Sequence, residues 1–280
     1  MRSARLLGHH HQALGSIAAI GEGPAAICLS LGGAAKTYAH TDPNEDAACF
    51  AVGAGGTLVA VADGHFGARG AQCAVEWLLE GPAADWTAET PPASSSAAWH
   101  ERLADALQQI HRAVVEQDRS LGLDPAPTTL SMAVARPLEN LVVHASVGDS
   151  PLFLATTKAA RNVGWSAKGV SGCAFLGERY EGGVLQESQC VVGSEPSAGL
   201  DAIIVASDGL CETGIGVSDA AAAAAAATTH GADVDLEFRP LETCKHLSET
   251  ALQAHRDNRA GDNIGAAVAW IGAKAGSSRD

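Results

Sequence analysis

Hydrophobic and polar positions divide the sequence into short apolar runs separated by polar turns. Two such runs, at residues 46–52 and 57–62, flank the Gly-rich segment 53–56, and this arrangement predicts a β-hairpin. Further apolar runs predict strands at residues 129–135, 141–147, 152–155, 201–206 and 264–271. Because short turns join neighbouring runs, we expect sheets that are mostly antiparallel.

Four longer stretches have the pattern of helices. Three of them are residues 67–80, 218–230 and 240–258, and the second contains eight consecutive alanines. The fourth begins after the Pro-, Ser- and Ala-rich segment 81–96, which predicts a loop, and it carries an apolar stripe. The stripe consists of Trp99, Leu103, Ala106, Leu107, Ile110, Val114 and Leu121. Strands and helices together predict an α+β fold with helices packed outside the sheets.

The order of these elements predicts a single domain over residues 31–280, without repeats or linkers. Residues 1–30 are expected to be a leader of uncertain structure. The apolar stretch of this leader is interrupted at His9, His10 and His11, which argues against a signal peptide. Residues 156–190 are mixed and Gly-rich and predict no particular element. No apolar run has the length of a membrane span.

The composition narrows the class of function. The chain has 280 residues, of which 46% are hydrophobic and 18% are charged, as in ordinary globular proteins. Its formal net charge of −14 and the lack of a basic run argue against nucleic acid as a main partner. The seven cysteines are scattered and lack the spacing of a zinc knuckle, which indicates buried thiols in a reducing cytoplasm.

Acidic residues adjoin glycine at the ends of the predicted strands. The junctions are Asp63-Gly64, Gly148-Asp149, Asp208-Gly209 and Gly261-Asp262, and the acidic pair Glu45-Asp46 opens another strand. Each junction alone is explained by a turn, because Asp and Gly are common turn residues. As a set they predict strand ends that converge, and closely packed carboxylates need cations. Ligand sets made only of oxygen favour Mg²⁺ or Mn²⁺ over Zn²⁺.

Six blocks of sequence, in this order, resemble the type-2C metal-dependent Ser/Thr protein phosphatases, the PPM family, of the bacterial type. The blocks are PNEDAACFAV, LVAVADGHFG, TTLSMAVA, VGDSPLFL, IIVASDGLCET and GDNIGAAVAWI, within residues 36–272. The resemblance implies a β-sandwich of two mostly antiparallel sheets flanked by α-helices, in four layers α-β-β-α. It also implies two Mn²⁺ or Mg²⁺ ions, with a weak third, and hydrolysis of phosphoserine or phosphothreonine by a hydroxide held between two ions.

The resemblance implies a role for each acidic position. Asp63 is expected to bridge the two metal ions, and Asp208 and Asp262 are expected to complete the shell of the first ion. The backbone carbonyl of Gly64, helped by Glu45, is expected to bind the second ion.

Three further positions follow from the same resemblance. Asp46 is expected to hold metal-bound waters, and Asp149 to recruit the third ion. His65 is expected to be the general acid that protonates the leaving oxygen, because an imidazole titrates near neutral pH. Simpler interpretations stay open: Asp149 shapes a turn, Glu45 is a solvated acid, and His65 is structural. His144, which alternates within a strand, is expected to be a satisfied sheet residue.

The chain departs from the family at the residue that binds substrate phosphate. The family usually has an arginine four residues before the glutamate of the NED block, where this chain has Thr41 beside His40. Neither residue offers the planar fork of arginine, so charged His40 or Arg69 is a hypothesis for the replacement. Phe66 stands where a glycine is commoner, and we expect its ring in the core. Residues 156–190 correspond to the variable flap beside the active site.

Three functions compatible with this scaffold follow. The first is an active, monomeric, cytoplasmic signalling enzyme that acts on phosphoproteins made by a Ser/Thr kinase, with no nucleic acid or membrane as partner. The second is a pseudophosphatase that binds a partner, supported only by the missing arginine. The third is a phosphatase of small phosphoesters. We expect the first, because every expected metal position carries the required acid.

Overall fold

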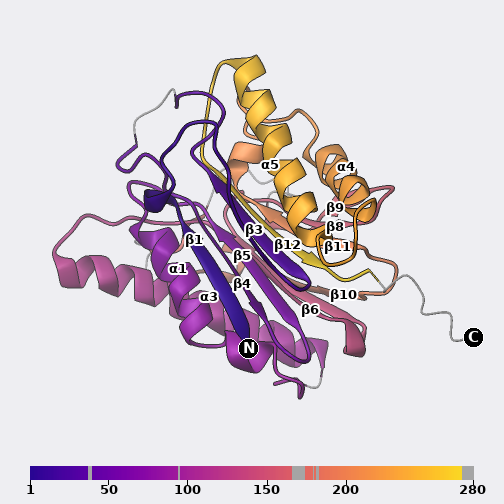
Figure 1. Cartoon of the computed structure of the whole chain (residues 1–280). Coiled ribbons are helices and arrows are strands. Elements are labelled where there is room, and N and C mark those ends of the chain that lie inside the picture. Colours follow the sequence, from indigo (N-terminus) through magenta and orange to yellow (C-terminus); the bar gives the residue numbers. More distant parts are fainter. Residues whose placement is uncertain (37–39, 94, 166–173, 179, 181–182, 273–280) are drawn as a thin grey trace, which may run out of the picture.

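Two six-stranded antiparallel sheets, stacked face to face, form the centre of the molecule (Figure 1). The computed structural model describes the chain except for residues 37–39, 94, 166–173, 179, 181–182 and 273–280. The first sheet has the order β1 (Arg2–Leu7), β4 (Ala47–Val52), β5 (Thr57–Ala62), β6 (Leu130–Arg136), β7 (Leu141–Val147) and β10 (Val191–Glu195). The second has the order β2 (Ala18–Glu22), β3 (Ala25–Ser30), β12 (Ile264–Trp270), β11 (Ala202–Ala206), β8 (Leu152–Ala155) and β9 (Ala160–Asn162).

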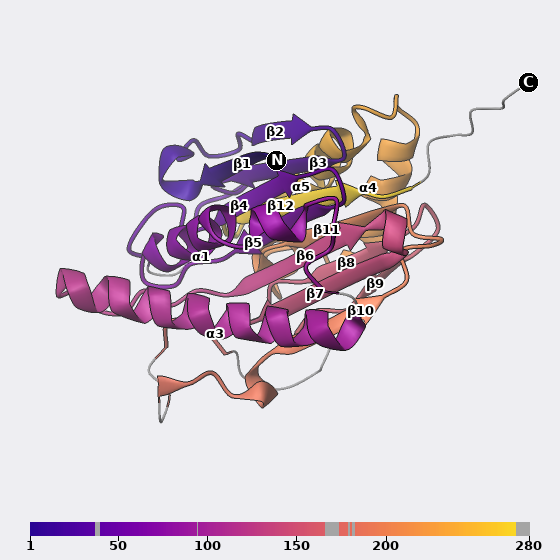
Figure 2. The same cartoon turned by 90° about the horizontal axis from the view of Figure 1, so that it is seen from below.

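Helices cover both outer faces of the sandwich (Figure 2). The helices α1 (Arg69–Glu80), α2 (Ala83–Trp86) and α3 (Ser96–Leu121) pack on the first sheet. The helices α4 (Ala220–Ala232) and α5 (Arg239–Asn258) pack on the second. One apolar cluster fills the space between the sheets, and one lies under each helical layer. The layers are therefore α-β-β-α, which confirms the predicted fold class.

Strand β5 shows why the sequence reads as apolar runs. Leu58 and Ala60 pack under the helices, whereas Val59 and Val61 pack between the sheets. All six residues of the strand are buried, so its sequence lacks the alternation of apolar and polar residues that a half-exposed strand would have. The β4–β5 and β6–β7 hairpins lie where the sequence predicts them.

Residues 1–30, expected to be a leader of uncertain structure, instead supply three strands. β1 pairs with β4 at one edge of the first sheet. β3 lies between β2 and β12 in the second sheet, and all six of its residues are buried. The run AAICLS at 25–30 carried a signal for β3, but its partner β12 is remote in sequence. The N-terminal segment is thus part of the sandwich itself.

Other differences concern the segments around α3. The predicted loop 81–96 contains the short helix α2, whose Trp86 meets Trp99 edge to face with ring centroids 6.2 Å apart. The apolar stripe of α3 is buried from Trp99 to Val114, but Leu121 is 57% exposed. The strands β9 and β10 had no counterpart in the expected elements.

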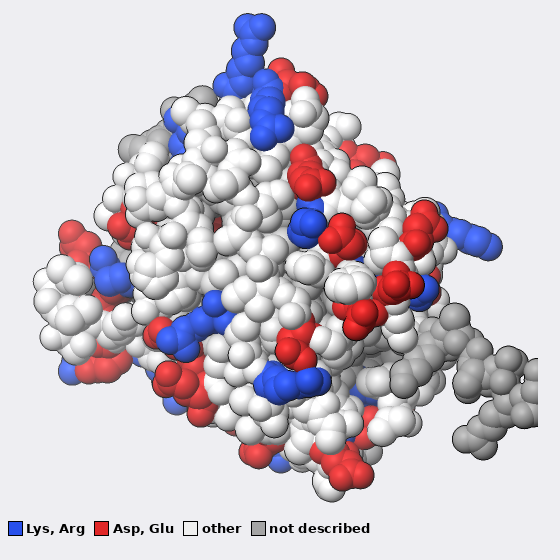
Figure 3. Space-filling model, in the orientation of Figure 1, with Lys and Arg blue, Asp and Glu red and all other residues white. Residues whose placement is uncertain are grey.

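The surface carries charges of both signs. On the face shown in Figure 3, lysines and arginines are dispersed among aspartates and glutamates. Within the described part of the chain, no helix combines the length and the apolar character needed to cross a bilayer. Each cysteine that the structure describes is a free thiol.

Candidate metal centre and active site

The sandwich brings several strand ends to one edge. β4 begins beside the end of β5, since Ala47 pairs with Ala62. β11 ends beside the start of β12, and β8 begins beside the end of β11. Because β5 also packs against β12, the acidic residues that flank these strands lie near one another, as the sequence predicts.

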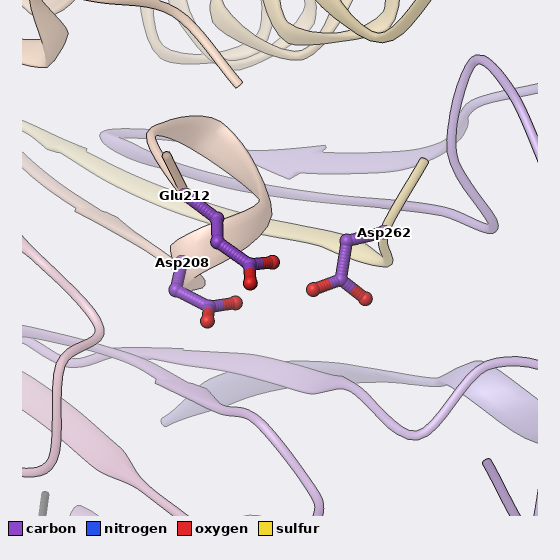
Figure 4. Close-up of side chains that lie close together, drawn as sticks. All are labelled: Asp208, Glu212 and Asp262. Carbon is purple, nitrogen blue, oxygen red and sulfur yellow. The ribbon is translucent and has the colours of Figure 1, made fainter. Parts of the chain in front are cut away.

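Three carboxylates converge as one group. Asp208, Glu212 and Asp262 each offer an oxygen within 4.8 Å of the other two (Figure 4). Asp208 opens the 3-10 turn Asp208–Leu210, and the Glu212 N–H donates to the Asp208 carbonyl at 2.7 Å. This turn brings Glu212 back to the side of Asp208. Glu212 was not among the expected site residues, and its spacing four residues after Asp208 is the signal that could have found it.

Asp63 and Asp46 join the cluster from the first sheet. The Asp63 N–H donates to Thr129 Oγ1 at 3.1 Å, and the Thr129 N–H donates to the Asp63 carbonyl at 2.9 Å. Asp46 Oδ2 accepts a hydrogen bond from Ser207 Oγ at 2.7 Å. The same hydroxyl oxygen accepts from the Gly265 N–H at 2.8 Å. Ser207 therefore joins the first sheet to the start of β12 beside the cluster.

Burial and mutual repulsion raise the pKa values of these carboxyl groups. Burial, followed by the charges of Asp208 and Asp46, raises the pKa of Asp63 well above its ordinary value. Burial and then Asp262 raise the pKa of Asp208. Burial is also the main cause that raises the pKa of Asp46 to about 7 and that of Glu212 to about 7. Without a cation, the cluster resists full ionisation at neutral pH.

One positive charge is already built into the cluster. Lys36 Nζ lies 3.1 Å from Asp262 Oδ1, and the two side chains are only 5% and 7% exposed. The Lys36 charge also lowers the pKa values of Asp46 and Glu212, so it lies within electrostatic reach of both. A parallel bridge between Lys36 and Gly261 fixes the backbone beside this pair. The sequence did not reveal Lys36, because no local motif marks it.

Four buried carboxylate oxygens have no hydrogen-bond partner among the described residues. They are Asp46 Oδ1, Asp149 Oδ1, Asp208 Oδ1 and Glu212 Oε2. An unpaired buried oxygen of this kind is unfavourable, and a cation bound to it removes the penalty. Because the donors are all oxygens, the residues present fit a hard divalent cation such as Mg²⁺ or Mn²⁺.

Glu45 and Gly64 border the cluster through backbone contacts. Glu45 Oε1 accepts the N–H groups of Thr41 and Asp42, each at 3.0 Å. The Glu45 N–H donates to Asn263 Oδ1 at 2.8 Å. A Cβ atom added at Gly64 would lie 2.7 Å from the Glu45 carbonyl oxygen, so only glycine fits there. The two segments therefore meet at the backbone level beside Asp262.

His65 lies next to the cluster and packs against the flap segment. Burial lowers the pKa of His65, and the charges of Asp149 and Glu45 oppose this shift. His65 Nε2 is buried and has no hydrogen-bond partner within the described part of the chain. The ring of Phe175 meets the imidazole edge to face, with centroids 4.4 Å apart. The Tyr180 hydroxyl accepts from the Phe175 N–H at 2.8 Å and donates to the Phe175 carbonyl at 2.9 Å, which holds Phe175 in place.

The residues expected to bind the substrate phosphate do not form one group. Arg69 Nε donates to Asp118 Oδ1 at 3.1 Å, and Arg69 Nη2 donates to the Asp124 carbonyl at 2.9 Å. The guanidinium is thus held at the C-terminal part of α3 and the loop that follows it. His40 and Thr41 are exposed, and the Thr41 N–H donates to Glu45 Oε1 at the border of the cluster.

Two aromatic residues differ from expectation. Phe66, expected in the core, is 73% exposed and has a φ of 62°. It belongs to the tight turn between Asp63 and Gly67, where the positive φ directs the ring to solvent. His144 was expected to be a satisfied sheet residue, but its buried Nδ1 has no hydrogen-bond partner among the described residues.

Residues 35–244 match the family described as Protein phosphatase 2C. No curated protein matches the sequence. The fold is similar to that of the serine/threonine phosphatase Stp1 from Staphylococcus aureus, with a TM-score of 0.62 and 16% identity over 94% of this chain and 98% of that chain.

Two further solved structures share the fold. One is the catalytic domain of the serine threonine protein phosphatase PstP in complex with two manganese ions, with a TM-score of 0.59 and 18% identity over 91% of this chain and 99% of that chain. The other is PppA, a key regulatory component of T6SS in Pseudomonas aeruginosa, with a TM-score of 0.60 and 21% identity over 90% of this chain and 98% of that chain. At these identities the likeness shows the fold.

Proposed function

We propose, because the chain belongs to the protein phosphatase 2C family, that it is a metal-dependent phosphatase that removes phosphate from serine and threonine residues of proteins. One observation carries the proposal. Carboxylates at the ends of four strands converge, and within the described part of the chain several of their buried oxygens and the neighbouring His65 Nε2 have no hydrogen-bond partner. A turn-forming role explains neither the convergence nor the unpaired atoms.

The chain offers ligands for more than one divalent cation. Asp63, Asp208 and Asp262 are the proposed carboxylate ligands of the main pair of ions, Mn²⁺ or Mg²⁺. The Gly64 carbonyl and Glu45 are proposed for the second ion, Asp46 for bound waters, and Asp149 with Glu212 for a third ion. Such ions would supply Lewis-acid activation of water and of the phosphoryl group.

His65 is the proposed proton donor. As the P–O bond to the serine or threonine breaks, His65 Nε2 gives its proton to the leaving oxygen. Water supplies the hydroxide that ends on phosphorus, and the proton that this water releases to the solvent is balanced by one that His65 takes up again from the solvent. Burial lowers the pKa of His65, so the protonated form of the ring is less populated at a given pH. The carboxylates of Asp149 and Glu45 act against this effect without cancelling it, so they favour the protonated ring relative to burial alone.

The substrate phosphate needs positive charge that the usual arginine does not supply here. We propose Lys36 for this role, because its ammonium lies at the cluster. His40 and Thr41 are exposed next to Glu45 and are proposed as further contacts. Arg69 is better suited to hold the turn after Gly67 against α3, since its guanidinium is bonded to Asp118.

Hydrolysis of an aryl phosphate with Mn²⁺, with and without a chelator, tests the proposal. Wild-type activity should disappear with chelator and return with added Mn²⁺. Asp208→Asn, which keeps the shape of the side chain, should lower kcat by about 100-fold or more. Asp85→Asn is the matched control, because Asp85 is an exposed acid on α2. Chelator-resistant activity, or an Asp208→Asn variant equal to wild type, would refute the metal mechanism.

The substrate class is tested separately. Phosphoserine and phosphothreonine peptides, products of Ser/Thr kinases, should be hydrolysed with a higher kcat/KM than small alkyl phosphates. The opposite order would favour a phosphatase of small phosphoesters. Binding of Mn²⁺ without any hydrolysis would favour a non-catalytic binding module.

A further inference from the structure

Phe66 combines two features that are each unfavourable for the free protein. Its φ of 62° lies in the left-handed region, which a bulky side chain adopts only with strain. Its ring is 73% exposed, so a large apolar surface is left in water. Backbone strain and exposed apolar groups of this kind concentrate at sites that bind ligands. The combination therefore points to a contact that forms only when substrate is present.

The turn that carries Phe66 is held on both sides. The His65 N–H donates to the Pro127 carbonyl at 2.8 Å, and the Ala68 N–H donates to Asp42 Oδ2 at 2.9 Å. Phe66 lies between these two anchored residues and directly follows His65. Successive Cα atoms are about 3.8 Å apart, so the backbone of Phe66 adjoins that of the proposed proton donor.

We propose that Phe66 contacts an apolar side chain of the protein substrate beside the phosphorylated residue, and so selects phosphosites with such a neighbour. This inference rests on the proposed function. An extended peptide advances about 3.3 Å per residue, so the residues one or two positions from the phosphorylated one reach Phe66. A rigid aromatic ring gives such a side chain a large contact area with little loss of conformational freedom.

Two substitutions separate the ring from the backbone strain. Phe66→Gly removes the ring and suits the positive φ, whereas Phe66→Ala removes the ring and keeps the strain. For a phosphothreonine peptide with leucine next to the phosphorylated residue, both variants should raise KM about tenfold, with kcat unchanged. For the same peptide with serine in place of leucine, and for an aryl phosphate, the constants should stay within about twofold of wild type. Phe66→Gly should also melt at a higher temperature than Phe66→Ala.

Leu138→Ala is the matched control. Leu138 is 79% exposed in the turn Pro137–Glu139, at the end of β6 away from Thr129, whose backbone bonds Asp63. This variant should not change KM for any substrate. Equal KM values for the leucine peptide in wild type and both Phe66 variants would overturn the inference. An equal rise in KM for the aryl phosphate would also overturn the inference, because the ring would then be needed for the structure of the site and not for contact with the peptide.

Failure of the inference differs from failure of the proposed function. If wild type hydrolyses the peptides and the Phe66 variants match it, only the inference is wrong. If wild type hydrolyses none of the three substrates with Mn²⁺, the proposed function is wrong and the inference falls with it.

Discussion

Lys36 and Asp262 form a buried ion pair inside the carboxylate cluster, with 3.1 Å between Nζ and Oδ1. The pair joins the segment before β4 to the start of β12, and the bridge to Gly261 supports it. A divalent cation bound at Asp262 would neutralise the same carboxylate as Lys36. Metal binding and the Lys36–Asp262 ion pair would therefore be thermodynamically coupled, because either cation weakens the attraction of Asp262 for the other.

Lys36→Met should make this coupling measurable. The variant keeps the apolar stem of the lysine and leaves Asp262 without its counter-ion. The metal-free variant should lose about 3 kcal/mol of stability at pH 8. It should bind Mn²⁺ more tightly than wild type, because the metal no longer competes with the ammonium. Calorimetric melting with and without Mn²⁺, together with titration calorimetry, measures both effects.

Lys245→Met is the control for Lys36→Met, because Lys245 pairs with Glu242 on the surface of α5. It should change neither the stability nor the Mn²⁺ affinity by a measurable amount. If Mn²⁺ raises the melting temperature of wild type and of Lys36→Met equally, then Lys36 and the metal do not share Asp262.

The metal-free protein should become less stable as the pH rises from about 4 to about 7. In the folded chain the pKa of Asp46 is raised to about 7, whereas an unfolded Asp titrates near 3.9. Between these values the folded state holds a proton that the unfolded state has lost, so stability falls and the loss is complete above about pH 7. Asp46→Asn should remove on the order of 3 kcal/mol of this loss, as measured by urea unfolding at pH 5 and pH 8. A pH profile parallel to that of wild type would contradict the assignment.

His144 should contribute a dependence of the opposite sign. Burial lowers the pKa of His144 to about 4 in the folded chain, whereas an unfolded His titrates near 6.5. The contribution of the neutral imidazole to the free energy of unfolding is complete above pH 6.5. It is lost as the pH falls, by about 3 kcal/mol at pH 4. His144→Gln should remove this loss in urea unfolding between pH 7 and pH 4. The half-exposed His230 on α4 provides the control variant His230→Gln, which should keep the wild-type profile.

His65→Gln should affect substrates according to their leaving groups. A threonine oxygen needs a proton to depart, so kcat for a phosphothreonine peptide should fall about 100-fold or more. A nitrophenolate departs without a proton, so kcat for the aryl phosphate should fall by less than about tenfold. His246→Gln on α5 should match wild type on both substrates. Equal losses on the two substrates would show that His65 supports the site without donating the proton.

The sequence allowed the strands of the site to be predicted because their signals are local. The run before Asp63 and the run before Asp208 are both long enough to be buried strands, and each ends in an Asp-Gly pair. Hairpin turns fix neighbours only within a sheet, whereas the ends of β5 and β11 belong to different sheets and meet because the two sheets stack face to face. The roles of Asp63, Gly64, Asp149, Asp208 and Asp262 as metal ligands stay predictions that the proposed experiments test.

Other features of the site were not predicted, because the pattern of apolar residues does not show them. Lys36 belongs to the site because its backbone pairs with Gly261, more than two hundred residues later. Glu212 depends on a 3-10 turn that the pattern of apolar residues does not reveal. Phe66 was expected in the core because an apolar side chain is usually buried, but the backbone of its turn overrides this tendency.

The pairing of β3 with β12 has a consequence for the order of synthesis. β3 lies at residues 25–30 and β12 at residues 264–270, so the ribosome makes the first partner long before the second. Until β12 emerges, one edge of β3 has no strand to pair with, and such an edge invites aggregation. Asp262, two residues before the start of β12, is also missing from the growing chain. The proposed metal centre can therefore assemble only after nearly all of the sandwich has been translated, and a truncated nascent chain should be inert.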